Sequence, residues 1–213
     1  MESPRAPKRR PDDGRRAQLI AAATRVVARD GVAAATTRRI AQEAGVPHGL
    51  VHYWFSGKDE LLEEVVQGML RQLEAVTSAP AAQQHGRTAA EDVIERFRSA
   101  FAVVEGDDRG RQIALFELTT WSLRSAEHRE VARTQYAAYR ATAASVTGEW
   151  MAQHDVELPG SPDVLAQFVA ALFDGVNLAW LADPDGTRPD EIFAFASTLL
   201  AQFARDNEDA VSQ

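Results

Sequence analysis

The chain has 213 residues, enough for a small domain and a larger one, and its hydrophobic content of 45% is sufficient for a packed core. The absence of cysteine excludes a disulfide scaffold and a thiolate metal site, and it fits a reducing cytoplasm. The sequence shows no apolar run of 18 residues and no hydrophobic segment near its start, so we expect neither a membrane span nor a secretory signal.

The net charge of −8 argues against nucleic-acid binding until its distribution is considered. Residues 1–58 contain 11 Lys and Arg against 5 Asp and Glu, a net charge of +6, whereas the remainder carries −14. A basic N-terminal part followed by an acidic body is typical of a DNA-binding protein with a separate regulatory domain.

The first 14 residues are rich in proline and basic residues and lack apolar periodicity, so we expect a disordered basic arm. Two interpretations stand level: the arm follows the DNA backbone or the minor groove, or it is a solvated tail. A supporting helix is expected next, from Asp12 or Asp13 to Arg29, with apolar residues at helical spacing.

The segment that begins at Thr36 has the layout of two short helices joined by a tight turn. Thr36 is expected to cap the first helix, and Gly45 lies just past its end, where the left-handed conformation favours glycine. In the second helix, residues 47–54, Val51 shares one face with Phe55 at about 100° per residue. The opposite face is free to enter a DNA groove, so the pattern predicts a helix-turn-helix.

The sequence Thr-Thr-Arg-Arg-Ile-Ala-Gln-Glu-Ala-Gly-Val from residue 36, and His-Tyr-Trp-Phe-Ser-Gly-Lys-Asp-Glu-Leu-Leu from residue 52, resemble the DNA-binding domain of the TetR family of bacterial repressors. The resemblance covers residues 15–65. Two positions depart from the family pattern: Pro47 stands where a small polar N-cap is common, and His52 replaces the usual tyrosine. Proline suits the first helical position, so the helix is kept.

The helical periodicities and this resemblance imply an all-α fold of about nine helices. After the arm over residues 1–14, we expect a three-helix helix-turn-helix DNA-binding domain over residues 15–60. A larger helical domain for ligand binding and dimerisation follows over residues 61–206, and residues 207–213 form a polar tail.

The predicted DNA contacts lie on the outward face of the second helix and around it. Nearest the base edges we expect His48, Gly49, Leu50 and His52. Phosphate contacts are expected from Thr37, Arg38, Tyr53, Trp54 and Lys58, with Thr36 at the helix start. Arg38 also has the reach to contact a guanine, and the indole N–H of Trp54 is expected to face a phosphate. The alternative is that His52, Tyr53 and Trp54 only fill the core of the small domain.

A longer helix, capped by Ser56 and ending near Val76, is expected to connect the two domains. After a linker over residues 77–86, Thr88 and Glu91 have the spacing of a capping box. Histidines 85, 128 and 154 are expected to be solvated, and no metal-ligand spacing occurs. The remaining helices are expected over residues 88–104, 111–123, from after Ser125 to 154, 162–181 and 189–205.

The last two helices are predicted to form a homodimer, because in TetR-like proteins the last two helices of each subunit pair into a four-helix interface. A two-fold dimer also follows from the reading helix, because one short helix contacts too few bases for useful specificity. The alternative is that both helices bury only within their own subunit. The predicted interface residues are Phe168, Leu172, Val176, Ile192, Phe195, Leu199 and Phe203.

A small-molecule pocket is expected among the helices of the body. Glu117 and Asn177 are polar residues in apolar stretches and need partners if they are buried. Aromatic groups with one carboxylate suit a cationic ligand, although aromatic residues at helical spacing are more often core. The region around Trp121 and residues 172–177 resembles the BetI-type branch, whose effectors include choline-like compounds. The candidate pocket residues are Phe97, Phe101, Phe116, Glu117, Trp121, Tyr139, Phe173, Asn177 and Trp180.

These features predict a ligand-responsive transcriptional repressor of the bacterial cytoplasm, associated with the nucleoid and independent of cofactors. A homodimer would bind double-stranded DNA at a palindromic operator, and a small-molecule effector in the body would release it. One alternative is an architectural protein that binds DNA without sequence preference. Another is an all-α enzyme, for which the sequence offers no Gly-x-x-x-x-Gly-Lys-Ser/Thr loop, no His-Glu-x-x-His motif and no cysteine nucleophile.

Overall fold

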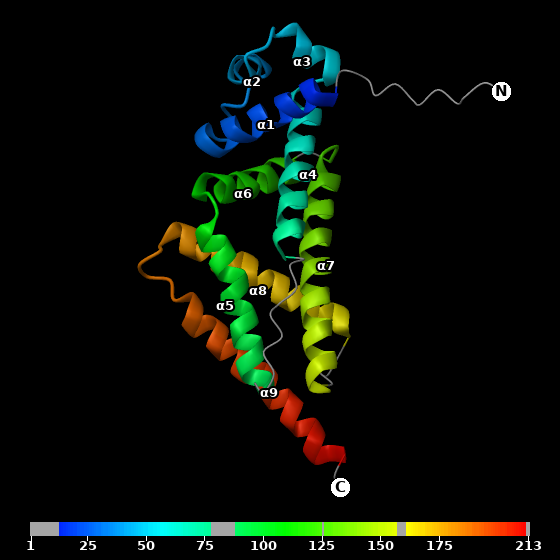
Figure 1. The fold of residues 1–213 in the computed structure, drawn as a ribbon, viewed down its shortest axis with the longest axis vertical. Coiled ribbons are helices and arrows are strands. Elements are labelled where there is room, and N and C mark those ends of the chain that lie inside the picture. Colours follow the sequence, from blue (N-terminus) through cyan, green and yellow to red (C-terminus); the bar gives the residue numbers. More distant parts are fainter. Residues whose placement is uncertain (1–12, 78–87, 125, 157–160, 212–213) are drawn as a thin grey trace, which may run out of the picture. The chain divides into compact units, whose positions relative to one another are not determined.

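The computed structural model describes residues 13–77, 88–124, 126–156 and 161–211, and gives the backbone alone for Asp13, 72–77, 201 and 203–211. These residues form nine helices and no strand, as predicted (Figure 1). The expected linker lies almost wholly outside this part of the chain, and so does most of the expected arm. The helices are α1 (Asp13–Asp30), α2 (Thr37–Ala44), α3 (Gly49–Trp54), α4 (Lys58–Thr77), α5 (Ala89–Gly106), α6 (Arg109–Leu123), α7 (Arg129–His154), α8 (Pro162–Ala182) and α9 (Pro189–Val211).

The first compact unit consists of the residues up to Met69 together with Gly110–His128. The apolar stripe predicted for α1 is buried, and it packs with α2, α3 and the first part of α4 around one small core. Helix α6 also belongs to this unit, so the chain does not divide at the single boundary expected near residue 61. The fully buried apolar side chains include Leu19, Val26, Ile40, Val51, Phe55, Leu61, Val65 and Leu118.

The second compact unit consists of Leu70–Arg109 and Arg129–Gln213. Within it, α5 packs against α9 and α7 packs against α8. The centre of this core is aromatic: the ring of Phe193 lies 5.2 Å from that of Phe97 and 5.1 Å from that of Phe173, which are themselves 5.5 Å apart. The buried members of the core include Val93, Phe97, Phe101, Trp150, Val169, Val176 and Phe193.

The helix ends largely follow the predicted capping chemistry. The hydroxyl of Thr36 accepts a hydrogen bond from the backbone N–H of Arg39, and Gly45 ends α2 in the left-handed conformation with φ 66°. Thr88 and Glu91 form the expected capping box, and Ser161 caps α8 with Pro162 in its first turn. Local sequence therefore determines these ends.

The expected cap of α4 is wrong, because Ser56 does not accept a bond from the helix. Its backbone N–H and its hydroxyl both donate to the carboxylate of Glu60, at 2.7 and 2.8 Å, and the helix begins at Lys58. These two hydrogen bonds lower the pKa of Glu60 below its usual value. The carboxylate of Glu60 thus ties the preceding loop to the first turn of α4.

Helix α7 is anchored in the second unit, because Val131, Gln135 and Trp150 are buried along it, and the Trp150 indole N–H donates to the Ala89 carbonyl at 3.0 Å. The expected end of the last helix needs correction. Helix α9 continues to Val211, into the stretch expected to be a polar tail.

Helix α8 is long and apolar enough, by length and composition alone, to cross a membrane, a test that buried core helices also pass. In the structure its apolar residues serve two faces of a packed helix. Val169 and Val176 are buried in the core, whereas Val164, Phe168 and Leu178 are exposed. One side of α8 thus packs into the core, and the opposite side exposes a second apolar surface.

Candidate nucleic-acid interface

Helix α3 is held by two apolar anchors and presents the rest of its surface outward. Val51 and Phe55 are buried, as the helical angle predicts. The turn before the helix is fixed by the backbone N–H of Val46, which donates to the Ala41 carbonyl at 3.0 Å. Because α3 has only six residues, these anchors leave its opposite face free.

The outward face carries the residues predicted to read base edges. His48, Gly49 and His52 are exposed, while Leu50 is half-buried. The rings of His48 and His52 meet edge to face at 4.9 Å, and Nε2 of His48 lies 3.0 Å from the hydroxyl of Thr37 on α2. This hydrogen bond joins the second helix of the motif to the first and orients the His48 ring.

Gly49 leaves open space at the start of α3. A Cβ placed there would meet no atom within 4 Å, so packing within the protein does not require glycine at this position. Gly49 therefore leaves room at this point for the close approach of another surface.

Tyr53 and Trp54 differ, although both were predicted to contact phosphates. Tyr53 is 71% exposed and its hydroxyl is available to an external partner. The indole Nε1 of Trp54 is buried and has no hydrogen-bond partner, so the predicted donation to a phosphate is wrong in this structure. Trp54 lies about 60° around the helix from Val51, which places it beside the buried face.

Lys58, also predicted to contact a phosphate, has a partner within the protein. Its Nζ donates to the Val32 carbonyl at 2.8 Å, while the Val32 N–H donates to the carboxylate of Glu117 at 2.7 Å. The peptide groups of Val32 are thus held from α4 on one side and α6 on the other. A lysine at a helix start, unfavourable by the helix dipole, is explained by this contact.

Basic residues around the motif are partly engaged in ion pairs. Arg39 pairs with Asp30 at 2.9 Å, and Arg25 pairs with Glu43 at 2.9 Å. The predicted phosphate ligand Arg38 is exposed and forms none of the ion pairs identified among the described residues. Its guanidinium is therefore available to DNA.

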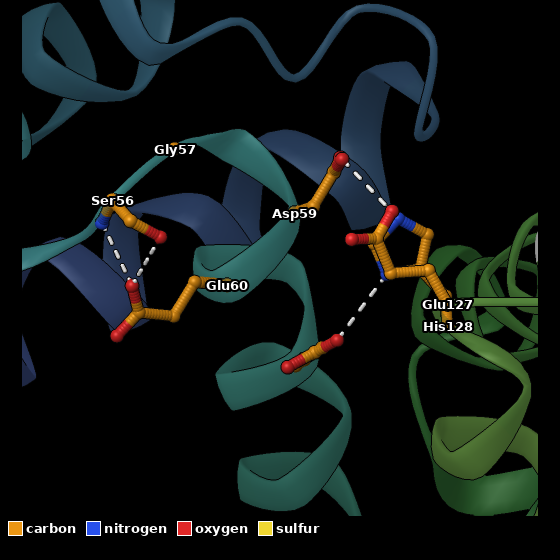
Figure 2. Close-up of a pocket in the computed structure, with 7 residues that line it drawn as sticks. Ser56, Gly57, Asp59, Glu60, Glu127 and His128 are labelled. Atoms are coloured by element: carbon orange, nitrogen blue, oxygen red, sulfur yellow. Dashed lines mark hydrogen bonds and ion pairs between the residues drawn. The ribbon is translucent and has the colours of Figure 1, made fainter.

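An open, acidic pocket of about 430 Å³ lies at the start of α4 (Figure 2). His128 lies at its edge, with Nε2 3.2 Å from the Asp59 carboxylate and Nδ1 3.3 Å from the Glu63 carboxylate. The ring also stacks on Trp121 at 4.6 Å. The expectation that His128 is solvated is wrong, because its ring contacts the carboxylates of Asp59 and Glu63 and stacks on Trp121.

Comparison with known proteins identifies the family. Residues 19–65 match the family described as bacterial regulatory proteins, tetR family, and residues 90–205 match the BetI-type transcriptional repressor, C-terminal family. The second match alone covers more than half of the chain. The chain belongs to the TetR family, with a BetI-type C-terminal part.

Two curated relatives and one solved structure show how far the similarity extends. The nicotine-responsive transcriptional repressor HdnoR of Paenarthrobacter nicotinovorans is 32% identical over 178 residues, covering 84% of this chain and 89% of that protein. The regulator BetI 2 of Chromohalobacter salexigens is 32% identical over 191 residues, covering 88% of this chain and 87% of that protein. The multidrug binding protein EbrR, crystallised with ethidium, is 26% identical with a TM-score of 0.65, covering 89% and 99% of the two chains.

The residues predicted to bind the effector are divided between the two compact units. Phe116, Glu117 and Trp121 belong to the first unit. Phe116 is half-buried, the carboxylate of Glu117 accepts from the Val32 N–H, and Trp121 stacks on His128. Glu117 and Trp121 therefore have structural partners in the first unit, and their place in an effector pocket stays a prediction.

In the second unit, the predicted effector residues Phe97 and Phe101 are core residues instead. Both are 4% exposed, Phe97 stacks on Phe193, and Phe101 meets Trp180 edge to face at 5.9 Å. Phe173 packs against the same cluster. The alternative interpretation, in which aromatic residues at helical spacing form the core, is correct for these positions.

Tyr139 and Asn177 have polar surroundings that distinguish them from the aromatic core. The Tyr139 hydroxyl accepts a hydrogen bond from the amide of Gln135 at 2.9 Å, and burial raises the pKa of Tyr139. Asn177 is half-buried, and its side-chain oxygen is buried without a hydrogen-bond partner. These two remain effector candidates.

The predicted dimer residues likewise separate into exposed and buried positions. Phe168, Phe195 and Leu199 are exposed, Phe195 to 68%. Leu172 and Ile192 are half-buried against the core, and Val176 is 4% exposed within it, so the assignment of Val176 to the interface is wrong. The side chain of Phe203 lies outside the described residues.

His154, expected to be solvated, is instead part of a polar network at the end of α7. Its Nε2 lies 3.0 Å from the Asp92 carboxylate, which also accepts from Arg96 at 3.0 Å. Burial acts to raise the pKa of Asp92, but the hydrogen bonds from His154 and Arg96 outweigh it and lower that pKa. In the described part of the chain, no group of three or more His, Asp or Glu side chains is arranged so that it could hold a metal ion.

Proposed function

We propose that this TetR-family protein represses transcription as a homodimer that binds a palindromic operator in double-stranded DNA. The observation that carries the proposal is the face of α3, where His48, Gly49 and His52 are exposed around two buried anchors. A helix held in this way inserts into the major groove and contacts base edges.

Residues of α2, the first helix of the motif, and Tyr53 of α3 set the position of α3 on the duplex. Thr37, Arg38 and Tyr53 are available for phosphate contacts, with Thr36 fixing the start of α2. Phosphate contacts determine register and orientation but carry no sequence information directly. Arg38 additionally has a side chain suited to bidentate recognition of guanine.

The exposed apolar residues of α8 and α9 support dimerisation. Val164, Phe168, Leu178, Phe195 and Leu199 are exposed on these two helices. Large exposed apolar surfaces mark interaction sites, and two-fold symmetry brings the same surface of each subunit together. A dimer also gives two reading helices, which fit half-sites one helical turn apart.

We further propose that a small molecule releases the protein from DNA and that the protein acts in the cytoplasm, on the nucleoid. The named relatives support release by a ligand, since one is a nicotine-responsive repressor and another is a multidrug binding protein crystallised with ethidium. Ligand binding changes DNA affinity when it favours one arrangement of the regulator, and a coupling free energy of about 1–3 kcal/mol is typical.

Competition with random DNA tests this function. Purified protein is mixed with fragments of the source genome and a large excess of random duplex, and the retained fragments are sequenced. Retention of a few discrete fragments is expected, because specific affinity exceeds non-specific affinity by about 10³-fold or more. Loss of all fragments to the competitor would support the architectural alternative instead.

A further inference from the structure

A polar cluster lies between α7 and α8 in the second unit. The hydroxyl of Tyr136 donates to the carboxylate of Asp174 at 2.6 Å, and Tyr139 lies close enough to interact electrostatically with the same carboxylate. The rings of Tyr136 and Tyr139 are 5.6 Å apart and tilted by 60°. Two phenol rings and one carboxylate thus meet at a single place.

The carboxylate of Asp174 has no cationic partner among the described residues. It is half-buried, and its one identified hydrogen bond comes from a neutral phenol. The pKa of Tyr136 is raised, chiefly by burial and then by the hydrogen bond to Asp174. This phenol therefore stays protonated and supplies no charge. A partly buried carboxylate normally pairs with a cation, because removal from water penalises the charged form.

Asn177, on the same helix face, adds an acceptor that has no donor. It lies three residues after Asp174, and side chains at this spacing are neighbours on a helix surface. Its Oδ1 is buried and has no hydrogen-bond partner in the described structure. Buried acceptors without a donor are rare in folded proteins and call for a partner.

Together these observations define the chemistry of the missing partner. It must bring a positive charge to Asp174 and an N–H donor to Asn177, and its charge can also interact with the faces of Tyr136 and Tyr139. An anionic ligand would be repelled by the carboxylate, and a neutral hydrocarbon would leave the charge of Asp174 uncompensated and Asn177 without a donor.

We propose that the second unit binds a protonated amine that still carries an N–H, with Asp174 as its counter-ion and Asn177 as the acceptor of that N–H. This inference rests on the proposed function, in which a small molecule binds the C-terminal part. It goes further by naming the ligand class and the two residues that select it. A quaternary ammonium ion meets the first requirement and lacks the donor for the second.

Three probes of similar size separate the two requirements. N,N-dimethylbenzylamine is protonated at pH 7 and has one N–H, benzyltrimethylammonium has the charge without an N–H, and N,N-dimethylbenzamide has neither. Titration of the full-length protein by calorimetry is expected to give affinities in that order. The amine should bind several-fold more tightly than the quaternary ion and at least about tenfold more tightly than the amide.

Variants assign each requirement to its residue. Asp174→Asn keeps an acceptor for Tyr136 and should weaken both cations about tenfold or more. Asn177→Leu should weaken the amine several-fold and leave the quaternary ion unchanged. Asp185→Asn, at an exposed position in the turn after α8, is the matched control and should bind all probes as wild type does. Thermal unfolding establishes that each variant is folded.

The outcomes are decisive in either direction. Equal binding of the amine and the amide, wild-type affinity in Asp174→Asn, or no binding of either cation by the folded wild-type protein would overturn the proposal. The titration contains no DNA, so it is independent of the repressor function. If genome fragments are not retained but Asp174-dependent amine binding is found, the repressor proposal fails and this one stands.

Discussion

Glu117 should stabilise the first compact unit, because its carboxylate accepts a hydrogen bond from the N–H of Val32 at 2.7 Å. Val32 is 7% exposed, so replacing Glu117 with leucine leaves a nearly buried donor without an acceptor. Such a loss costs about 1–3 kcal/mol of unfolding free energy. Glu117→Gln keeps an oxygen that can accept the bond and should cost less.

Gly31 lets the loop that carries Val32 approach the Glu117 carboxylate closely. Its φ is +83°, and a Cβ there would lie 3.0 Å from Oε2 of Glu117, so the loop approaches the carboxylate closely. A rearrangement that supplies another acceptor to Val32 must therefore move a tight loop. We expect little compensation in the leucine variant.

Thermal unfolding at fixed protein concentration measures the effect. For a chain of this length, 1 kcal/mol corresponds to a change in Tm of about 2–4 °C. The expected order of Tm is wild type, then Glu117→Gln, then Glu117→Leu. Glu105→Leu, a matched substitution at an exposed position on α5, should change the unfolding free energy by less than about 0.5 kcal/mol. An unchanged Tm in Glu117→Leu, combined with weaker effector binding, would refute this reasoning and return Glu117 to the ligand pocket.

Three further predictions concern the DNA contact, the dimer and pH. His52→Ala should change the preferred base at one or two positions in DNA selected from a random pool, whereas His154→Ala, in the other unit, should recover the wild-type sequence. Phe195→Asp should convert the dimer to a monomer in analytical ultracentrifugation, while Val103→Asp, at an exposed apolar position on α5, should remain dimeric. The lowered pKa of Asp92 means that the folded state binds its proton less tightly than the unfolded state. Asp92 therefore adds stability above its ordinary pKa of about 3.9, and this is lost as the pH falls through the folded value. Asp92→Asn should unfold at a lower temperature than wild type at pH 7, with the difference shrinking toward pH 3; a constant difference would contradict this role.

The features that local sequence determines could be predicted well. Thr36, Gly45 and the Thr88 capping box act within a few residues of chain, and each has the expected geometry. The anchors Val51 and Phe55 follow from the helical angle alone. Short-range hydrogen bonds and periodicity carry this information, so the fold class and most helix bounds follow from the sequence.

The errors arise where a side chain meets a partner far along the chain. Lys58 and Glu117 bind the two peptide groups of a loop 26 and 85 residues away, and His128 meets a carboxylate 65 residues away. Nothing in the spacing of these residues indicates those contacts. The unfavourable lysine at the start of α4 indicated an acceptor nearby, and the Val32 carbonyl is one such acceptor. The phosphate contact of Lys58 stays a prediction.

The assignment of core and surface on α8 shows a second limit. Phe168, Leu172 and Val176 share one apolar spacing, yet Phe168 is exposed and Val176 is in the core. A helix that is apolar on two sides gives no periodic signal to separate its inner face from its outer face. Only the positions of the neighbouring helices resolve the two.

The most direct test of the central claim is selection of random duplex DNA by the purified full-length protein, followed by sequencing of the bound pool. A dimer with two reading helices predicts a palindrome whose half-sites lie about one helical turn, or 34–36 Å, apart. Recovery of no common sequence, with binding that disappears in moderate salt, would contradict sequence-specific repression and indicate electrostatic binding alone.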